Sequence, residues 1–188
     1  MNPGFSDVLS YWFGSPECCE RGLPRKCWFE KDPEFDAAIR ARFISTWEAA
    51  RAGDLAAWER GPLSVLALIV VLDQFPRNMF REQARAFASD PLARTIAAGA
   101  LVRGFDAQAP DGMRGFFYLP FEHSENLADQ ERGVAFYKAS GDADGLKWAE
   151  LHADIIRRFG RFPHRNKALG RATTPDEQAF LDAGGFSG

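Results

Sequence analysis

The sequence predicts an all-α protein: a single domain over residues 1–188, with about seven helices in antiparallel pairs. Apolar residues recur at helical spacing between clear capping residues, and no stretch alternates polar and apolar residues long enough for a strand. The chain has 188 residues, is 46% hydrophobic and contains 17 Phe and 5 Trp. That is enough to bury one aromatic-rich core.

The first predicted helix runs from Pro33 to Gly53. Asp32 is typical of a helix cap, proline fits the first helical position, and glycine is typical of a helix end. One face of this helix carries the apolar side chains that recur every four residues: Phe35, Ile39, Phe43 and Trp47.

Proline, glycine and short polar residues place the other helices. A short helix follows Asp54 and ends at Gly61. Pro62 begins a helix that is apolar on nearly all sides, Leu63 to Phe75, and Pro76 is expected to end or kink it. The remaining helices are predicted at Asp90 to Arg103, Leu127 to Lys138, Leu146 to Phe159 and Thr174 to Gly184. Asp90 is expected to cap the first of these, and a capping box begins the last. A short turn over Phe116 to Phe121 is expected to lead into a helix.

Composition limits the classes of partner. A net charge of −3 argues against a general nucleic-acid or membrane-surface binder, although Arg157 to Arg171 alternates arginine with phenylalanine, as single-strand binders also do. The longest apolar run, Val65 to Leu72, is too short to span a bilayer, and no secretory signal precedes it. Cys18, Cys19 and Cys27 are expected to be free thiols in a cytoplasmic protein without metal or cofactor.

Two short segments echo each other and carry candidate ligand-binding residues. Each places arginine and asparagine after Phe-Pro, in Gln74 to Asn78 and, with His164 in between, in Arg161 to Asn166. Arginine presents a planar pair of donors that suits a carboxylate or phosphate. A pocket for a small anionic molecule or peptide is therefore predicted from this set: Asp73, Arg77, Asn78, Arg81, His123, Glu125, His152, Arg161, His164, Arg165 and Asn166.

The two histidines on predicted helices each have more than one interpretation. His152 shares a helix face with Trp148, Ile155 and Phe159, and is either a hydrogen-bonded core histidine or a general base. His123 is flanked by glutamates that either orient its ring, bind a metal or stabilise a helix N-terminus; the residues concerned are Glu122 and Glu125, with Ser124 or Asn126 as the helix cap.

Asp73 lies on the apolar face of its helix, where an unpaired carboxylate is costly. Arg77 and Arg81 are its nearest predicted partners, and an arginine of the second Phe-Pro segment is the more distant one. The alternatives are a structural ion pair that clamps helix ends and a residue of the pocket.

Three motifs together resemble the hallmarks of a bacterial domain-of-unknown-function family, nine-two-four. They are Leu72 to Asn78, Leu119 to Glu125 and Arg158 to Asn166, and the similarity extends from Tyr11 to Phe186. The resemblance implies an all-helical fold of the tetratricopeptide-like kind and no established activity, substrate or catalytic residue. Where family members often have Met or Leu before the histidine, this chain has Glu122.

Three functions follow as hypotheses. The first is a binding module whose inward pocket takes a small anion or a peptide carboxylate. The second is a hydrolase- or lyase-type enzyme that uses a pocket histidine as acid and base. The third is a protein–protein interaction scaffold. No standard enzyme motif decides among them, and the sequence predicts no oligomeric state.

Overall fold

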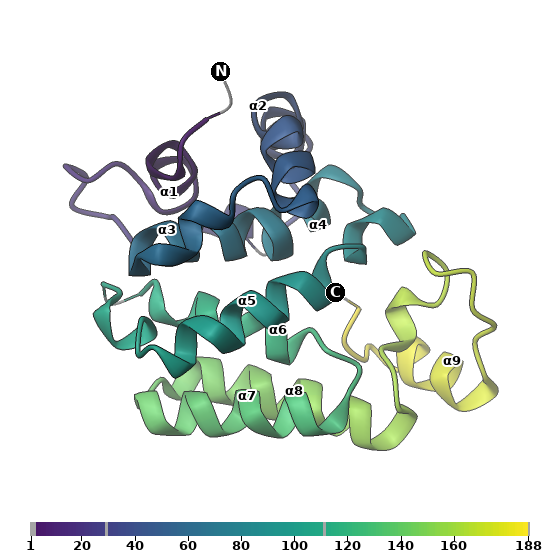
Figure 1. Ribbon diagram of the computed structural model, residues 1–188. Helices are drawn as coiled ribbons and strands as arrows, with labels where there is room; N and C mark the ends of the chain where they lie inside the picture. Colours follow the sequence, from purple (N-terminus) through teal and green to yellow (C-terminus); the bar gives the residue numbers. More distant parts are fainter. Residues whose placement is uncertain (1–2, 29, 111, 188) are drawn as a thin grey trace. The chain divides into compact units, whose positions relative to one another are not determined.

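Helices make up the regular structure of residues 3–28, 30–110 and 112–187, the part of the chain that the computed structural model describes (Figure 1). No strand occurs in these ranges. The α-helices are α1 (Phe5–Phe13), α2 (Pro33–Ala52), α3 (Pro62–Ile69), α4 (Phe75–Met79), α5 (Asp90–Val102), α6 (Leu119–Glu122), α7 (Leu127–Ser140), α8 (Ala143–Phe159) and α9 (Pro175–Asp182). A π-helical turn (Val70–Gln74) joins α3 to α4, and 3-10 turns occupy Lys26–Trp28, Ala56–Arg60, Ala84–Phe87, Asp106–Gln108, Arg114–Phe117 and Pro163–Arg165.

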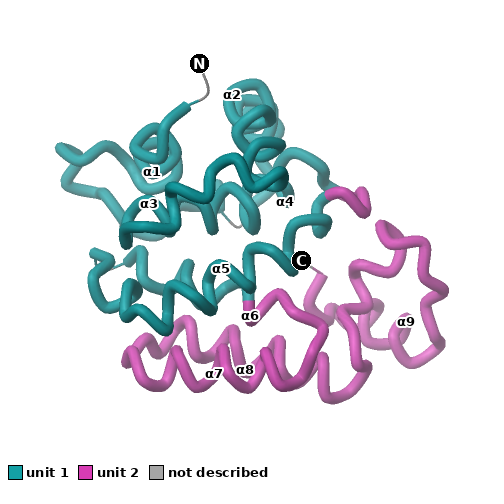
Figure 2. Tube along the Cα trace, viewed as in Figure 1, with its two compact units in different colours: residues 1–81, 86–120 teal, residues 82–85, 121–188 magenta. Residues whose placement is uncertain are grey.

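The chain divides into two compact units (Figure 2). Unit 1 comprises residues 1–81 and 86–120, and α3 packs there against α1 and α5, while α2 packs against α4. Unit 2 comprises residues 82–85 and 121–188, and its helices α7 and α8 lie side by side (Figure 1). The single domain expected over residues 1–188 stays a prediction. Among the described residues, no helix is both long enough and apolar enough to cross a bilayer.

The predicted caps of α2 and α9 are confirmed. The side chain of Asp32 accepts hydrogen bonds from the backbone of Glu34 and Phe35, and Gly53 ends α2 in the left-handed conformation. The capping box at Thr174 is present, with Glu177 as its second member. These helix boundaries depend on contacts within one turn, so the local sequence is sufficient to place them.

Helix α1 was not predicted from the sequence. The carboxylate of Asp7 accepts a 2.8 Å hydrogen bond from the Gly4 backbone N–H at its N-terminus. Its buried residues are Val8, Leu9, Trp12 and Phe13. The Trp12 ring contacts Trp28, with 5.8 Å between ring centroids, and lies 5.6 Å from Phe75. The aromatic core expected from composition is therefore assembled around α1.

The helix continues past Pro76, which was predicted to end or kink it. The preceding turn widens so that the Phe75 N–H donates to the carbonyl of Val70, five residues earlier, and α4 continues past the proline. Proline has no N–H for the Leu72 carbonyl four residues before it. The hydroxyl of Ser89 donates to this carbonyl at 2.6 Å, so a side chain from a distant segment replaces the missing backbone donor.

Two other helix starts differ from prediction. Asp90 does not cap α5: Ser89 occupies the cap position, and no side chain makes a capping hydrogen bond there. Helix α8 begins three residues earlier than expected because Asp142 caps it, accepting a 2.9 Å hydrogen bond from the Gly145 N–H. Trp148 lies outside the buried face of α8, with 52% of its surface exposed.

The start of α8 has no room for a side chain at Gly145. A Cβ atom at this position would collide with the Tyr137 ring of α7 and lie 2.7 Å from an oxygen of Asp142. Gly145→Ala should therefore lower the free energy of unfolding by about 1–3 kcal/mol, measured by urea denaturation. Gly99→Ala on α5 is the control: only the flexible end of Arg103 lies near that Cβ, at 3.9 Å, so this change should be neutral or stabilising. Equal losses in both variants would contradict the proposed collision.

Candidate functional site

In unit 1, Arg77 lies between two carboxylates. Its guanidinium donates to both oxygens of Asp90 at 3.0 Å and lies 3.5 Å from Asp73. Asp73 is fully buried and also accepts from the Gln74 amide at 2.6 Å. Burial opposes the charged form of Arg77, but the charges of Asp73 and Asp90 outweigh it and raise the pKa of the guanidinium. The structural alternative for Asp73, an ion pair with Arg77, is therefore present.

The other polar residues of the first Phe-Pro segment face Asp36 of α2. The Asn78 amide donates to its carboxylate at 2.7 Å. Arg81, expected as a partner of Asp73, instead makes a two-point ion pair with Asp36, with one contact of 2.9 Å. Asp73, Arg77, Asn78 and Arg81 thus lie in unit 1 and are occupied by contacts within it.

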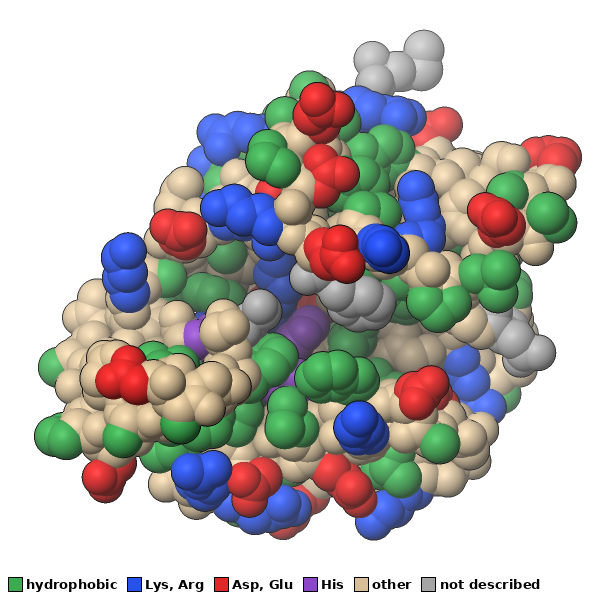
Figure 3. All heavy atoms as spheres, turned by 180° about the vertical axis from the view of Figure 1, so that it is seen from behind, with side chains coloured by type: hydrophobic (Ala, Val, Ile, Leu, Met, Phe, Trp, Pro, Cys, Tyr) green, Lys and Arg blue, Asp and Glu red, His purple; other side chains and the backbone are tan. Residues whose placement is uncertain are grey.

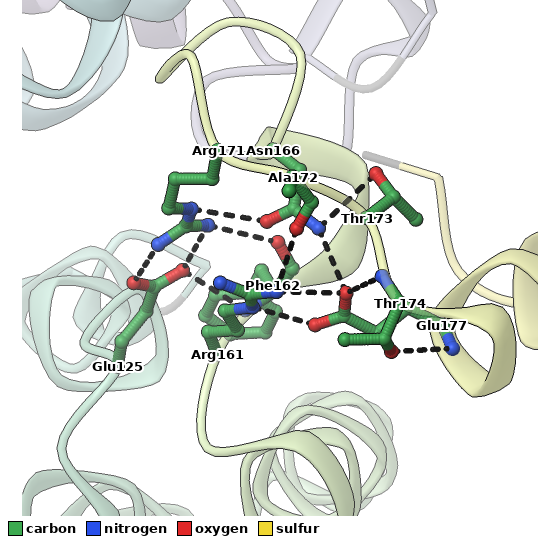
Figure 4. A network of polar contacts seen from close by, with 9 residues as sticks. All are labelled: Glu125, Arg161, Phe162, Asn166, Arg171, Ala172, Thr173, Thr174 and Glu177. Carbon is green, nitrogen blue, oxygen red and sulfur yellow. Dashed lines mark hydrogen bonds and ion pairs between the residues drawn. The ribbon is translucent and has the colours of Figure 1, made fainter.

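In unit 2, the second Phe-Pro segment joins a network built on Glu177 and Glu125 (Figure 4). Glu177 accepts hydrogen bonds from the Nε of Arg161 at 2.5 Å and from the amide of Asn166 at 3.1 Å. Glu125 accepts from both terminal nitrogens of Arg171, at 2.7 and 3.0 Å, and from the backbone N–H of Phe162 at 2.9 Å. Arg161, Asn166 and Glu125 are therefore engaged in contacts within their own chain.

The acids of this network have lowered pKa values. The hydrogen bond from Arg161 is the main reason that the pKa of Glu177 falls to about 2. Burial opposes ionisation of Glu125, but the hydrogen bonds from Arg171 and from the Phe162 backbone outweigh it and lower its pKa. Both carboxylates are therefore charged partners of arginine near neutral pH.

Four rings gather beside this network in unit 2. Phe186 packs edge-on against His152, with 4.4 Å between centroids, and lies 5.2 Å from His164. Phe162 lies 5.5 Å from His152 and 5.6 Å from His164, and the Arg165 guanidinium lies over its ring at 4.3 Å. We call His152, Phe162, His164 and Phe186 the histidine cluster. Histidine side chains are partly visible, recessed behind other residues, on the face seen in Figure 3.

Glu122 orients His152 from the end of α6. One oxygen of its carboxylate lies 2.7 Å from the imidazole Nδ1, and the Trp148 backbone carbonyl lies 2.9 Å from the same nitrogen. A carbonyl only accepts hydrogen bonds, so Nδ1 carries a proton and Nε2 is the basic nitrogen of the neutral ring. His152 and Glu122 are 6% and 3% exposed. The second Glu122 oxygen is buried and has no hydrogen-bond partner within the described ranges.

The predicted residues fall into three groups. His152, His164 and Arg165 meet at the histidine cluster, where the backbone carbonyl of His123 accepts a 3.0 Å hydrogen bond from Arg165. The other two groups are the Arg77–Asp36 region of unit 1 and the network of Figure 4. The cap alternative for the loop after His123 is confirmed for Asn126, whose side chain accepts from Ala128 at 2.9 Å.

Sequence reasoning missed several partners of the predicted residues. Glu122 was assigned to His123, its neighbour, rather than to His152, thirty residues away. Glu177 was recognised only as a cap, although the same carboxylate also binds Arg161. The charged partners absent from the prediction are Asp36, Asp90, Arg171 and Glu177, and Phe186 is the missed aromatic residue.

Two grooves on the described part of the chain are not lined by histidine. One groove lies at the end of α9, lined in part by Arg158, Phe159 and Phe180, and the other lies beside α1, lined in part by Tyr11 and Arg42. Within the described ranges, no group of three or more His, Cys, Asp or Glu is arranged to hold a metal ion. What the geometry offers for chemistry is thus the oriented imidazole of His152.

Fold and site together define an all-helical protein in which a buried glutamate orients a buried histidine. The chain belongs to the family described as "Bacterial protein of unknown function (DUF924)", which matches residues 8–185. It is also similar to the solved structure of the protein of unknown function ATU0120 from Agrobacterium tumefaciens, with 42% identity, a TM-score of 0.87, and coverage of 95% of this chain and 97% of that chain. No curated protein matches the chain. The resemblance stated from the motifs is confirmed, while the tetratricopeptide-like arrangement stays a prediction.

Proposed function

We propose that the protein is an enzyme in which His152 exchanges a proton with a small substrate through Nε2, with Glu122 as the positioning residue. The observation that carries the proposal is the 2.7 Å contact between the Glu122 carboxylate and Nδ1 of His152. A carboxylate on Nδ1 fixes the ring orientation and stabilises the imidazolium that forms when Nε2 takes up a proton. This is the arrangement of a general base in hydrolase- or lyase-type reactions.

The surroundings of His152 support a small anionic substrate. Arg165 is 6% exposed and lies next to Phe162, and its guanidinium donates to a backbone carbonyl, that of His123, at 3.0 Å. Its positive charge therefore lies beside the histidine cluster. His164 adds a second imidazole across the Phe186 ring.

The anion-binding module has less support as a function of the two Phe-Pro segments. Arg77, Arg81 and Arg161 each contact a carboxylate of the same chain. A bound anion or peptide carboxylate would have to displace these internal partners, which lowers its net gain in free energy.

A partner-binding role is the second candidate. It is favoured by the exposed apolar side chains on α7 and α8, where Trp148, Leu151 and Leu127 are 52%, 41% and 38% exposed. Trp148 holds His152 through its backbone alone, so a change of its side chain separates the two hypotheses.

The proton position on His152 is the first expected result. Nitrogen-15 NMR of the neutral ring should show hydrogen on Nδ1 and none on Nε2, the reverse of the tautomer usually favoured by free histidine, because the Trp148 carbonyl accepts from Nδ1. A ring protonated only on Nε2 would leave no basic nitrogen for the substrate and would contradict the proposal.

A second test of the same proposal is whether a substitution of His152 reduces turnover. A panel of p-nitrophenyl esters, phosphates and glycosides would be tested with the unmodified protein and with His152→Asn. The substitution should reduce any observed turnover by about 10²–10⁴-fold. Trp148→Ala is the matched control on the same helix and should retain turnover. Activity that survives in His152→Asn would disprove a role for this histidine.

A further inference from the structure

A second group of polar side chains lies in unit 1, in a groove of about 470 Å³ beside α1 and α2. This volume falls within the range of about 300–1,000 Å³ found for small-molecule sites. The groove is lined by Asp7, Ser10, Tyr11, Arg25, Phe35 and Arg42. None of these residues belongs to the histidine cluster, whose members are all in unit 2.

An aromatic ring and two backbone carbonyls hold the two arginines of this groove in place. The Tyr11 ring stacks on Phe35, with 5.3 Å between centroids and 13° between planes. The Arg42 guanidinium lies over the Tyr11 ring at 4.7 Å. Arg25 donates through one nitrogen to the backbone carbonyls of Tyr11 and Trp12, at 2.7 and 2.8 Å. The guanidinium groups are thus fixed by rings and backbone, which reduces the entropy lost when a ligand binds.

Neither arginine has a carboxylate partner among the described residues. Two acids lie near the groove, and both are used by backbone N–H groups. Asp7 accepts from Gly4 at 2.8 Å, and Asp32 accepts from the first turn of α2 at 3.0 Å. This distinguishes Arg25 and Arg42 from Arg77, Arg81 and Arg161, which are paired with carboxylates.

Both arginines lie beside Tyr11, Arg42 over its ring and Arg25 at its backbone carbonyl, and their charges act on the Tyr11 phenol. Burial raises the pKa of Tyr11, and the positive charges of Arg42 and Arg25 act against that rise, while Cys27 and Asp32 add to it. A ligand group that accepts hydrogen bonds at this point would meet two cationic donors and the Tyr11 hydroxyl.

We propose that this groove binds the oxyanion head group, a carboxylate or a phosphate, of a small organic acid. Arg25 and Arg42 bind the oxyanion, and the hydroxyls of Tyr11 and Ser10 supply neutral hydrogen bonds. Asp7 lies on the same groove and weakens the binding of an anion by repulsion. Removal of the Asp7 charge should therefore strengthen anion binding, whereas removal of an arginine charge should weaken it.

The test uses three probes, benzoate, phenyl phosphate and inorganic phosphate, each titrated into the full-length protein and followed by backbone amide NMR. Saturable shifts should appear at Ser10, Tyr11 and Arg42 with at least one probe. Saturation by benzoate alone identifies a carboxylate site, and saturation by the two phosphates identifies a phosphate site. The absence of saturable shifts at α1 and α2 with all three probes would overturn the proposal.

Substitutions separate a built site from general attraction to positive charge. Arg42→Gln should weaken binding by about tenfold or more, since a hydrogen bond to a charged group is lost. Arg51→Gln is the matched control: Arg51 is on the same helix and also lies over an aromatic ring, that of Trp47, at 4.8 Å, but does not line the groove. It should change the affinity by less than about twofold.

Asp7→Asn should strengthen binding by about two- to fivefold, because it removes the repelling charge. An increase in affinity cannot result from partial unfolding, so this variant protects the test against a folding defect in Arg42→Gln. Equal weakening by Arg42→Gln and Arg51→Gln, or no gain in Asp7→Asn, would disprove the assignment.

Discussion

Replacing Arg77 with methionine is expected to lower the free energy of unfolding by about 3–5 kcal/mol at pH 7. Arg77 is the shared cation of Asp73 and Asp90, which are 0% and 8% exposed. Without it, two buried carboxylates that lie close together lose the cation that they share, and methionine replaces only the volume of the side chain. Urea denaturation followed by circular dichroism measures the loss.

A second substitution identifies the cause of that loss. Asp73→Asn in the Arg77→Met background removes the charge of one of the two carboxylates that have lost their shared cation, so the double variant should be more stable than Arg77→Met alone. A second substitution that restores stability in this way is expected only if Arg77 and Asp73 interact through their charges. An effect of Arg77→Met below about 1 kcal/mol would mean instead that Arg77 is available for a ligand, as the sequence first indicated.

Local sequence was sufficient for the parts of the fold that depend on one helical turn. Asp32, Gly53 and Thr174 were recognised because cap and helix are adjacent in the chain. The sequence predicted that Pro76 ends or kinks its helix, but not that the Ser89 hydroxyl donates to the Leu72 carbonyl, which the proline leaves without an N–H donor. That hydrogen bond spans seventeen residues and requires the folded structure.

The sequence indicated which residues belong to the candidate site but not which residues they contact. Donor side chains are visible in a sequence, whereas the acceptors that fold onto them are not. Arg81 meets Asp36 across 45 positions, and Arg171 meets Glu125 across 46. Glu122 and His123 are neighbours in the chain, yet Glu122 contacts His152 of α8. The eleven residues take part in two ion-pair networks and one histidine cluster, and the pocket that they were predicted to line stays a prediction.

The network of Figure 4 also makes an expected contribution to stability in acid. The pKa of Glu177 is lowered from its ordinary value of 4.5 to about 2. A depressed carboxyl pKa stabilises the folded state above pH 4.5, and this contribution is lost as the pH falls through 2. Because the substitution removes the charged partner of Arg161, Glu177→Gln should lower the free energy of unfolding at pH 7 by about 1.5–3 kcal/mol, the usual range for a hydrogen bond to a charged group.

Glutamine is the informative replacement because it retains a capping-box side chain at the start of α9 and removes only the charge that binds Arg161. Denaturation measured at several pH values between 7 and 2 should show a smaller fall in stability below pH 4.5 for Glu177→Gln than for the unmodified protein. Asp176→Asn is the control in the same turn: Asp176 is exposed and should change stability by less than about 0.5 kcal/mol. Parallel curves for Glu177→Gln and the unmodified protein would show that the charge of Glu177 adds no stability, and would contradict the expected contribution of its ion pair with Arg161.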